Sequence, residues 1–147
     1  MNEERHDKAR RLPEAIEPFR ILIVEDEFEV ARLIGMALER QGYKFQAALD
    51  GMSALSDFDE FQPHLVLLDL TMPGLSGQEV YNVIRSKSDV PVLVVSALIG
   101  DRDVPVPEGV TGIMSKPFSP PNLARRVQTV LNEFYGIQNE QPNPPNL

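Results

Sequence analysis

The stretch LVLLDLTMPGLSGQEVYNVIRSK, residues 65–87, contains the pattern on which the whole fold is built. Its first four residues, 65–68, are all apolar, and continuous apolarity is typical of a strand buried on both faces of a parallel sheet. Ser76 and Glu79 then have the spacing of a helix capping box. We therefore predict a strand, a loop and a helix that ends near residue 87. The residues expected to face inward on this helix are Val80, Val83 and Ile84.

The same alternation of strand-like and helix-like segments continues on both sides of this stretch. Further strands are expected at 20–24, 43–48, 90–95 and 110–114, and further helices at 28–41, 50–58 and 120–135. Strands that alternate with helices indicate βαβ units, and therefore a parallel sheet with helices on both faces. With right-handed crossovers, five such units commonly give the strand order 2-1-3-4-5. The predicted fold class is α/β, a flavodoxin-like, doubly wound, five-stranded parallel sheet.

One segment departs from this alternation. Residues 98–108 read LIGDRDVPVPE and occupy the place of the fourth helix, yet they include Pro105 and Pro107. A proline inside a helix costs about 3 kcal/mol or more, and it also pushes the residue before it towards an extended conformation. We therefore expect the fourth helix to be shortened or replaced by a loop.

Length, composition and charge limit the classes of protein to consider. The 147 residues suit one domain, which we place at 19–136, after a charged, flexible leader at 1–18 and before a disordered, Pro- and Asn-rich tail at 137–147. The absence of cysteine excludes disulfides and thiolate metal sites. The net charge of −8 argues against direct binding to nucleic acid. No apolar run is long enough for membrane insertion and no signal peptide is evident, so a cytoplasmic location is expected.

Polar residues follow four of the five predicted strands. Glu25 and Asp26 come after the first strand, Asp69 after the third, Ser96 after the fourth and Lys116 after the fifth. Each of these is weak evidence alone, because acidic loops and surface lysines are common. In a parallel sheet, however, the carboxyl ends of the strands meet at one edge, where the functional site of such folds lies. We therefore expect one pocket with carboxylates, a hydroxyl group and an ammonium group.

Such a cluster of carboxylates favours a hard cation. Two like charges 4 Å apart repel by on the order of 4 kcal/mol at an effective dielectric constant near 20. Oxygen ligands suit Mg²⁺ or Mn²⁺, and His6 in the leader and His64 at the opposite sheet edge give no reason to expect zinc. Asp69 could then act as a nucleophile towards phosphorus, with the charge on the transferred group neutralised by the metal and Lys116.

At these residues the sequence resembles the receiver domain of two-component response regulators, the CheY-like family. The matching motifs are ILIVEDE (21–27), LVLLDLTMPGLSG (65–77), VPVLVVSA (90–97) and KPF (116–118). The resemblance extends over about residues 20–135 and rests on the combination of motifs rather than on any single one. It implies two-component signal transduction, in which a phosphoryl group comes from a histidine kinase or a histidine phosphotransfer protein.

The resemblance also implies a role for each matched residue. Asp26 would bind Mg²⁺ directly, Glu25 would bind it directly or through water, and Asp69 and the backbone carbonyl of Thr71 would complete the protein ligands. Asp69 would also be the phosphoacceptor.

Two further positions would act on the phosphoryl group itself. The Ser96 hydroxyl would move towards it and Lys116 would pair with it, and Pro117 would hold the turn through a cis bond. The family's own chemistry would be limited to self-phosphorylation and slow autodephosphorylation, so we do not expect a conventional enzyme.

Two sequence features bear on how a signal would leave the domain. Ile113 stands three residues before Lys116, where the family usually has Tyr or Phe, so the usual coupling between the hydroxyl and an aromatic ring cannot operate in that form. The residues after Tyr135 do not resemble a DNA-binding or catalytic domain. We therefore expect a single-domain regulator whose output goes through contact with an unknown downstream protein.

Three alternatives to this interpretation were considered. A degenerate receiver would bind proteins without using phosphate, which the complete set of site residues argues against. A flavin carrier would need a phosphate-binding loop after the first strand, whereas residues 25–27 are all acidic. A phosphatase with an aspartate nucleophile would need a second Asp where Thr71 stands.

Overall fold

The computed structural model describes residues 17–97, 100, 102 and 104–136. The predicted tail at 137–147 and all but the last two residues of the predicted leader at 1–18 lie outside this part. In chain order, its elements are β1 (Arg20–Val24), α2 (Phe28–Arg40), β2 (Lys44–Ala48), α3 (Gly51–Phe61), β3 (Leu65–Leu68), α4 (Gly77–Lys87), β4 (Val92–Ser96), β5 (Gly112–Ser115) and α5 (Pro120–Tyr135). All strand pairs are parallel, and the sheet order is β2-β1-β3-β4-β5. The predicted fold class and strand order are confirmed.

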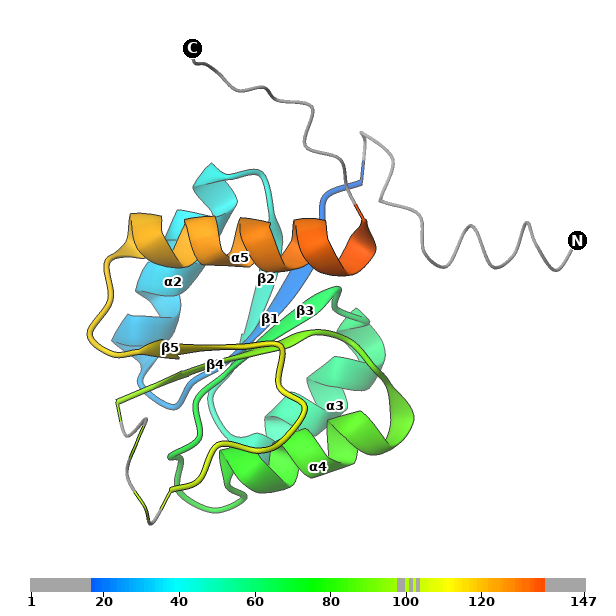
Figure 1. Ribbon diagram of the computed structural model, residues 1–147, viewed down its shortest axis with the longest axis vertical. Coiled ribbons are helices and arrows are strands. Elements are labelled where there is room, and N and C mark those ends of the chain that lie inside the picture. Colours follow the sequence, from blue (N-terminus) through cyan, green and yellow to red (C-terminus); the bar gives the residue numbers. More distant parts are fainter. Residues whose placement is uncertain (1–16, 98–99, 101, 103, 137–147) are drawn as a thin grey trace, which may run out of the picture.

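The sheet separates two hydrophobic clusters. Helices α2 and α5 cover one face of the sheet, and α3 and α4 cover the other (Figure 1). Strand β3 contributes to both clusters in alternation, because successive side chains of a strand point to opposite faces. Leu65 and Leu67 pack on the side of α2 and α5, whereas Val66 and Leu68 pack on the side of α3 and α4. This explains why the run at 65–68 is apolar at every position.

The helix that follows β3 begins with the predicted capping box. The backbone amide of Glu79 donates to the Ser76 hydroxyl at 3.2 Å, and the backbone amide of Ser76 donates to the Glu79 carboxylate at 2.9 Å. Val80 and Ile84 are fully buried, as predicted, but Val83 is 37% exposed, so its predicted inward orientation is wrong. Val83 lies at the border of the apolar stripe, where the neighbouring elements do not cover it.

The segment between β4 and β5 contains no helix among its described residues. These residues form turns, bends and irregular backbone, which agrees with the prediction that the fourth helix is shortened or replaced. The returning part of the segment is held by hydrogen bonds: the Tyr81 hydroxyl on α4 donates to the Glu108 carbonyl at 3.0 Å, and the Thr111 amide donates to the Val92 carbonyl at 2.8 Å. Side-chain and backbone bonds thus fix the segment where a helix would otherwise pack.

None of the helices in the described ranges has the length and apolar character needed to cross a membrane.

Candidate functional site

Main-chain hydrogen bonds bring three acidic residues to the carboxyl edge of the sheet. The Glu25 amide, directly after β1, donates to the Ala48 carbonyl at the end of β2 at 3.1 Å. The Asp69 amide, directly after β3, donates to the Val24 carbonyl at the end of β1 at 3.0 Å. The parallel ladder therefore continues one residue past the strands, and it fixes the backbone from which these carboxylates project.

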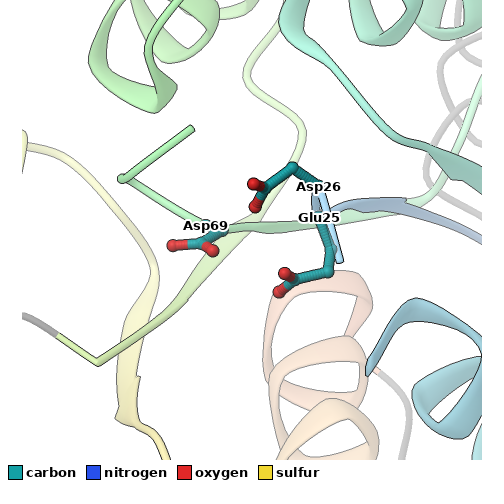
Figure 2. A group of neighbouring side chains, drawn as sticks. All are labelled: Glu25, Asp26 and Asp69. Carbon is teal, nitrogen blue, oxygen red and sulfur yellow. The ribbon is translucent and has the colours of Figure 1, made fainter. Parts of the chain in front are cut away.

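The side chains of Glu25, Asp26 and Asp69 form one cluster. One carboxylate oxygen from each residue lies within 4.8 Å of the other two, and Figure 2 shows the three carboxylates on the same side of the sheet edge. Glu25 is 2% exposed and Asp69 is 5% exposed, whereas Asp26 is partly exposed. Burial of negative charges at such short separations needs a compensating cation.

Lys116 provides one such positive charge. Its Nζ atom donates to Glu25 Oε1 at 2.7 Å and to Asp69 Oδ2 at 3.2 Å. Burial disfavours the charged ammonium, but its hydrogen bond to Glu25 and the negative charges of Asp69 and Glu25 outweigh that effect and raise the Lys116 pKa. The Lys116–Pro117 peptide bond is cis, as the family resemblance implied. The predicted meeting of Lys116 with the carboxylates is therefore found, and Glu25 is the closer of its two partners.

Glu25 uses both of its carboxylate oxygens within the protein. Oε1 accepts from Lys116, and Oε2 accepts from the Glu27 backbone amide at 3.1 Å. Burial raises the Glu25 pKa, while the hydrogen bonds from Lys116 and Glu27 oppose that rise. By contrast, no described residue donates a hydrogen bond to the Asp26 carboxylate. Asp26 therefore has more oxygen lone pairs available for an external cation than Glu25 has.

Thr71 holds the other oxygen of Asp69. Its backbone amide and its hydroxyl both donate to Asp69 Oδ1, at 3.1 Å and 3.2 Å. The sequence reasoning expected only the backbone carbonyl of this residue to matter and missed its side chain. The signal was present, because an Asp followed two residues later by a residue with an amide and a hydroxyl is typical of a local Asx-type turn.

Ser96 lies at the same edge of the sheet. It ends β4 and is fully buried, and its carbonyl accepts a hydrogen bond from the Lys116 amide at 3.0 Å. Since Leu68 pairs with Val94 in the parallel ladder, Ser96 lies near the level of Asp69 on the neighbouring strand. All five predicted strand-end residues therefore lie at one edge.

His64 lies at the opposite edge, as expected. Its Nδ1 atom accepts a hydrogen bond from the Arg20 amide at 2.9 Å, and its ring meets the ring of Phe19 edge-on at 5.1 Å between centroids. Burial, and then the charge of Arg20, lower its pKa from 6.5 to about 4. This histidine has a structural role and is not a ligand of the acidic cluster.

The donor set suits a divalent cation of the Mg²⁺ type. Three carboxylates offer oxygen atoms only, and no cysteine or histidine lies among them. Mg²⁺ and Mn²⁺ bind through one or two carboxylates together with water and phosphate oxygens. Asp26 meets that requirement best, because the carboxylates of Asp69 and Glu25 already accept hydrogen bonds from the protein on both oxygens.

Comparison with protein families gives one match to this arrangement. Residues 21–128 match the response regulator receiver domain family. Among curated proteins, the chain is 40% identical over 114 residues to a probable transcriptional regulator ycf27 of Porphyridium aerugineum, a match that covers 76% of this chain and 48% of the relative. It is 37% identical over 113 residues to the sensory transduction protein RegX3 of Mycobacterium tuberculosis, covering 76% and 50%. The chain thus spans about half the length of these relatives.

Solved structures show the same architecture. The response regulator protein TrrA of Thermotoga maritima, in complex with Mg(2+)-BeF, is 32% identical and superposes with a TM-score of 0.69, covering 76% of this chain and 98% of that one. A response regulator, described as putative, from Chloroflexus aurantiacus is 28% identical with a TM-score of 0.70, covering 78% and 98%.

Proposed function

The chain belongs to the response regulator receiver domain family, and from this premise we propose that Asp69 accepts a phosphoryl group from a histidine kinase or a histidine phosphotransfer protein. The observation that carries the proposal is the position of Asp69. It lies in a cluster of carboxylates, and one of its oxygens is held by Lys116 while the other is held by Thr71. A buried carboxylate placed in this way is oriented before any donor arrives.

The chemistry follows from the hydrogen bonds on the two oxygens of Asp69. Oδ1 accepts two hydrogen bonds from Thr71, whereas Oδ2 accepts one from Lys116 and keeps a lone pair for attack. In the proposed transfer, Oδ2 forms a bond to the phosphorus of a phosphohistidine. The phosphorus–nitrogen bond breaks, its electron pair stays on the imidazole nitrogen, and solvent supplies the proton. Lys116 and the Ser96 hydroxyl then pair with the phosphoryl oxygens.

We further propose that the cluster holds Mg²⁺ or Mn²⁺. Asp26 and Asp69 would be direct ligands, together with the backbone carbonyl of Thr71, and Glu25 would act directly or through water. When bound, the metal neutralises charge on the phosphoryl oxygens. Lys116 already forms ion pairs with Glu25 and Asp69. Part of the negative charge at the site is therefore neutralised before a metal binds.

The product would be an aspartyl phosphate with a limited lifetime. The chain offers a phosphoacceptor and a slow autodephosphorylation site rather than a turnover enzyme, and its output would pass through contact with another protein. Ile113, on the edge strand β5, is 39% exposed and could contribute to such a contact. The alternative function is a degenerate receiver that binds its partner without phosphate. The close spacing of Asp69, Lys116, Glu25 and Asp26 favours the first function, in which Asp69 is phosphorylated.

An apolar hollow next to the site supports a protein as the phosphoryl donor. Val30 and Leu33 of α2 line it together with Phe118, and Lys116 also lines it. Leu33 is 51% exposed, so this apolar side chain is open to solvent and can contact another protein. A donor that placed an apolar helix here would have its phosphohistidine next to Asp69.

The test is phosphorylation by acetyl phosphate with Mg²⁺, and separately by a histidine kinase, read as intact mass. Wild-type protein should gain one phosphoryl group, and Asp69→Ala should gain none while remaining folded. Leu33→Glu should keep its reaction with acetyl phosphate but lose most of its reaction with the kinase. If wild-type protein gains no phosphoryl group from either donor, the degenerate receiver becomes the better description.

A further inference from the structure

A glycine begins α4 where this helix meets the backbone of the phosphoacceptor. Gly77 is buried, and its amide donates to the Leu70 carbonyl at 3.2 Å. An ideal Cβ atom added to Gly77 would lie 2.5 Å from the Leu70 Cα atom, and closer still to the carbonyl oxygen of Asp69. Cβ atoms in proteins essentially never come within 3.0 Å of another heavy atom. Any side chain at position 77 would therefore push α4 and the backbone of Asp69 apart.

A second glycine approaches the same loop from α3. Gly51 is the first residue of that helix, and a Cβ atom added to it would lie 2.7 Å from both the Cβ atom and the carbonyl oxygen of Leu75. We call residues 69–77 the acceptor loop, because they start with Asp69. The acceptor loop thus ends at the glycine that begins α4, and the glycine that begins α3 packs against it at Leu75.

Space, rather than backbone conformation, is the reason for glycine at these two positions. Neither Gly51 nor Gly77 has a positive φ angle, whereas Gly74 within the same loop has a φ of 75°. Alanine could adopt the backbone angles of residue 77, and it favours a helix more than glycine does. The cost of a substitution there comes from its contact with Leu70 and Asp69.

The start of α4 is not free to move away from such a contact. The capping box between Ser76 and Glu79 fixes the first turn of the helix. At the other end of the contact, the Asp69 carboxylate is held by Thr71 and Lys116. A methyl group at position 77 would therefore displace the backbone that carries both the acceptor carboxylate and Thr71.

We propose that Gly77, supported by Gly51 at Leu75, is a positioning residue for phosphoryl acceptance; this inference rests on the proposed function. The added methyl group would need a shift of nearly 1 Å to reach an ordinary contact distance. Ligand distances in metal sites lie within about 0.2 Å of their reference values. A misplacement of about 1 Å can slow a reaction about 100-fold.

The experiment compares Gly77→Ala with a matched control, Gly35→Ala. Gly35 lies inside α2 on the other face of the sheet, and an added Cβ atom would lie 2.5 Å from Cε1 of Phe45. The control therefore adds a methyl group at a helical glycine whose short contacts are to the end of the Phe45 side chain rather than to backbone, and which does not touch the acceptor loop. For each variant we would measure the metal-free melting temperature, the Mg²⁺ affinity by calorimetry, the amide chemical shifts of residues 69–71 without metal, and the rate of phosphorylation.

We expect Gly77→Ala to bind Mg²⁺ at least about 10-fold more weakly and to be phosphorylated about 100-fold more slowly than wild type. The amide chemical shifts of residues 69–71 in Gly77→Ala should change even without metal. Gly35→Ala should stay within about twofold of wild type in both Mg²⁺ affinity and phosphorylation rate. Wild-type Mg²⁺ affinity and unchanged shifts in Gly77→Ala would overturn the proposal. Equal losses in both variants would also overturn it, because they would indicate general destabilisation.

A second variant decides the question if Gly77→Ala does not fold. Gly51→Ala moves the same loop at Leu75 and should also weaken Mg²⁺ binding; an unchanged affinity there would contradict the proposal. Failure of wild-type protein to accept a phosphoryl group from any donor would count against the proposed function itself. The metal-free shifts at 69–71 would still decide whether Gly77 positions Asp69.

Discussion

At the residue scale, His64 joins three elements through a single side chain and its own backbone. Its Nδ1 atom accepts from the Arg20 amide, its amide donates to the Arg20 carbonyl at 2.7 Å, and its carbonyl accepts from the Tyr135 hydroxyl at 2.8 Å. The beginning of β1, the residue before β3 and the end of α5 are connected in this way. A proton on Nδ1 would break the first of these bonds.

The His64 pKa leads to a prediction about pH. Burial and the Arg20 charge hold this pKa at about 4 in the folded protein, against 6.5 in the unfolded chain. Between these values the unfolded chain binds more protons at this residue, so the free energy of unfolding should fall as the pH is lowered from about 6.5 towards 4. The contribution is fully present above pH 6.5. Because solvent reaches part of the ring, we expect a loss of about 1 to 2 kcal/mol, measured by urea denaturation at several pH values.

His64→Asn is the control for this pH dependence. Asparagine offers a carbonyl oxygen near the position of Nδ1, so it can accept the Arg20 hydrogen bond but does not titrate in this range. The variant should lose stability less steeply than wild type between pH 6.5 and 4. Parallel curves for the two proteins would show that His64 does not contribute.

At the scale of elements, α4 holds the segment that stands in place of the fourth helix. Tyr81 is buried on α4, its hydroxyl donates to the Glu108 carbonyl, and the same oxygen accepts from Arg85 Nε at 3.0 Å. Arg85 also donates to the carbonyls of Ser88 and Val90, at 3.0 Å and 2.8 Å. The two side chains therefore connect α4, the start of β4 and the returning segment.

Tyr81→Phe should weaken this connection. The change removes the hydrogen bond to Glu108 and leaves Arg85 Nε without its partner, so the free energy of unfolding should fall by about 1 to 2 kcal/mol. Urea denaturation measures the loss, and hydrogen exchange at the Thr111 amide should accelerate. Tyr43→Phe is the matched control, since the Tyr43 hydroxyl makes no hydrogen bond within the described part of the chain. A similar loss in both variants would contradict the proposed connection.

At the scale of the whole molecule, a cation bound at the carboxyl edge should stabilise the fold by mass action. A ligand at ten times its dissociation constant adds about 1.4 kcal/mol, or about 3 to 6 °C in melting temperature for a domain of this size. Asp26→Asn should reduce this Mg²⁺-dependent shift. Asp59→Asn, which removes a surface acid paired with Lys87 at 2.9 Å, should leave it unchanged. An equal shift in Asp26→Asn and wild type would count against the metal site.

The sequence predicted the architecture well because its signals are local. Continuous apolar runs marked the strands, the Ser76 capping box marked the start of α4, and Pro105 and Pro107 marked the interrupted fourth helix. The position of Val83 was wrong because helical periodicity does not show which neighbours cover the border of a stripe. The contacts of Tyr81 with Glu108, and of Gly77 with Asp69, were missed because each joins residues whose proximity depends on the path of a loop.

The two edges of the sheet differ in how their side chains affect stability: like charges repel at one edge, and hydrogen bonds join the elements at the other. Strands of four or five residues, at about 3.3 Å each, separate the acidic cluster from the hydrogen-bonded aromatic group around His64 by about 15 Å. Crowded negative charge at one edge opposes folding, whereas the hydrogen bonds around His64 at the other edge do not touch the acidic cluster. Substitutions in the acidic cluster can therefore change the chemistry of one edge while the hydrogen bond between Tyr135 and His64 at the other edge stays in place.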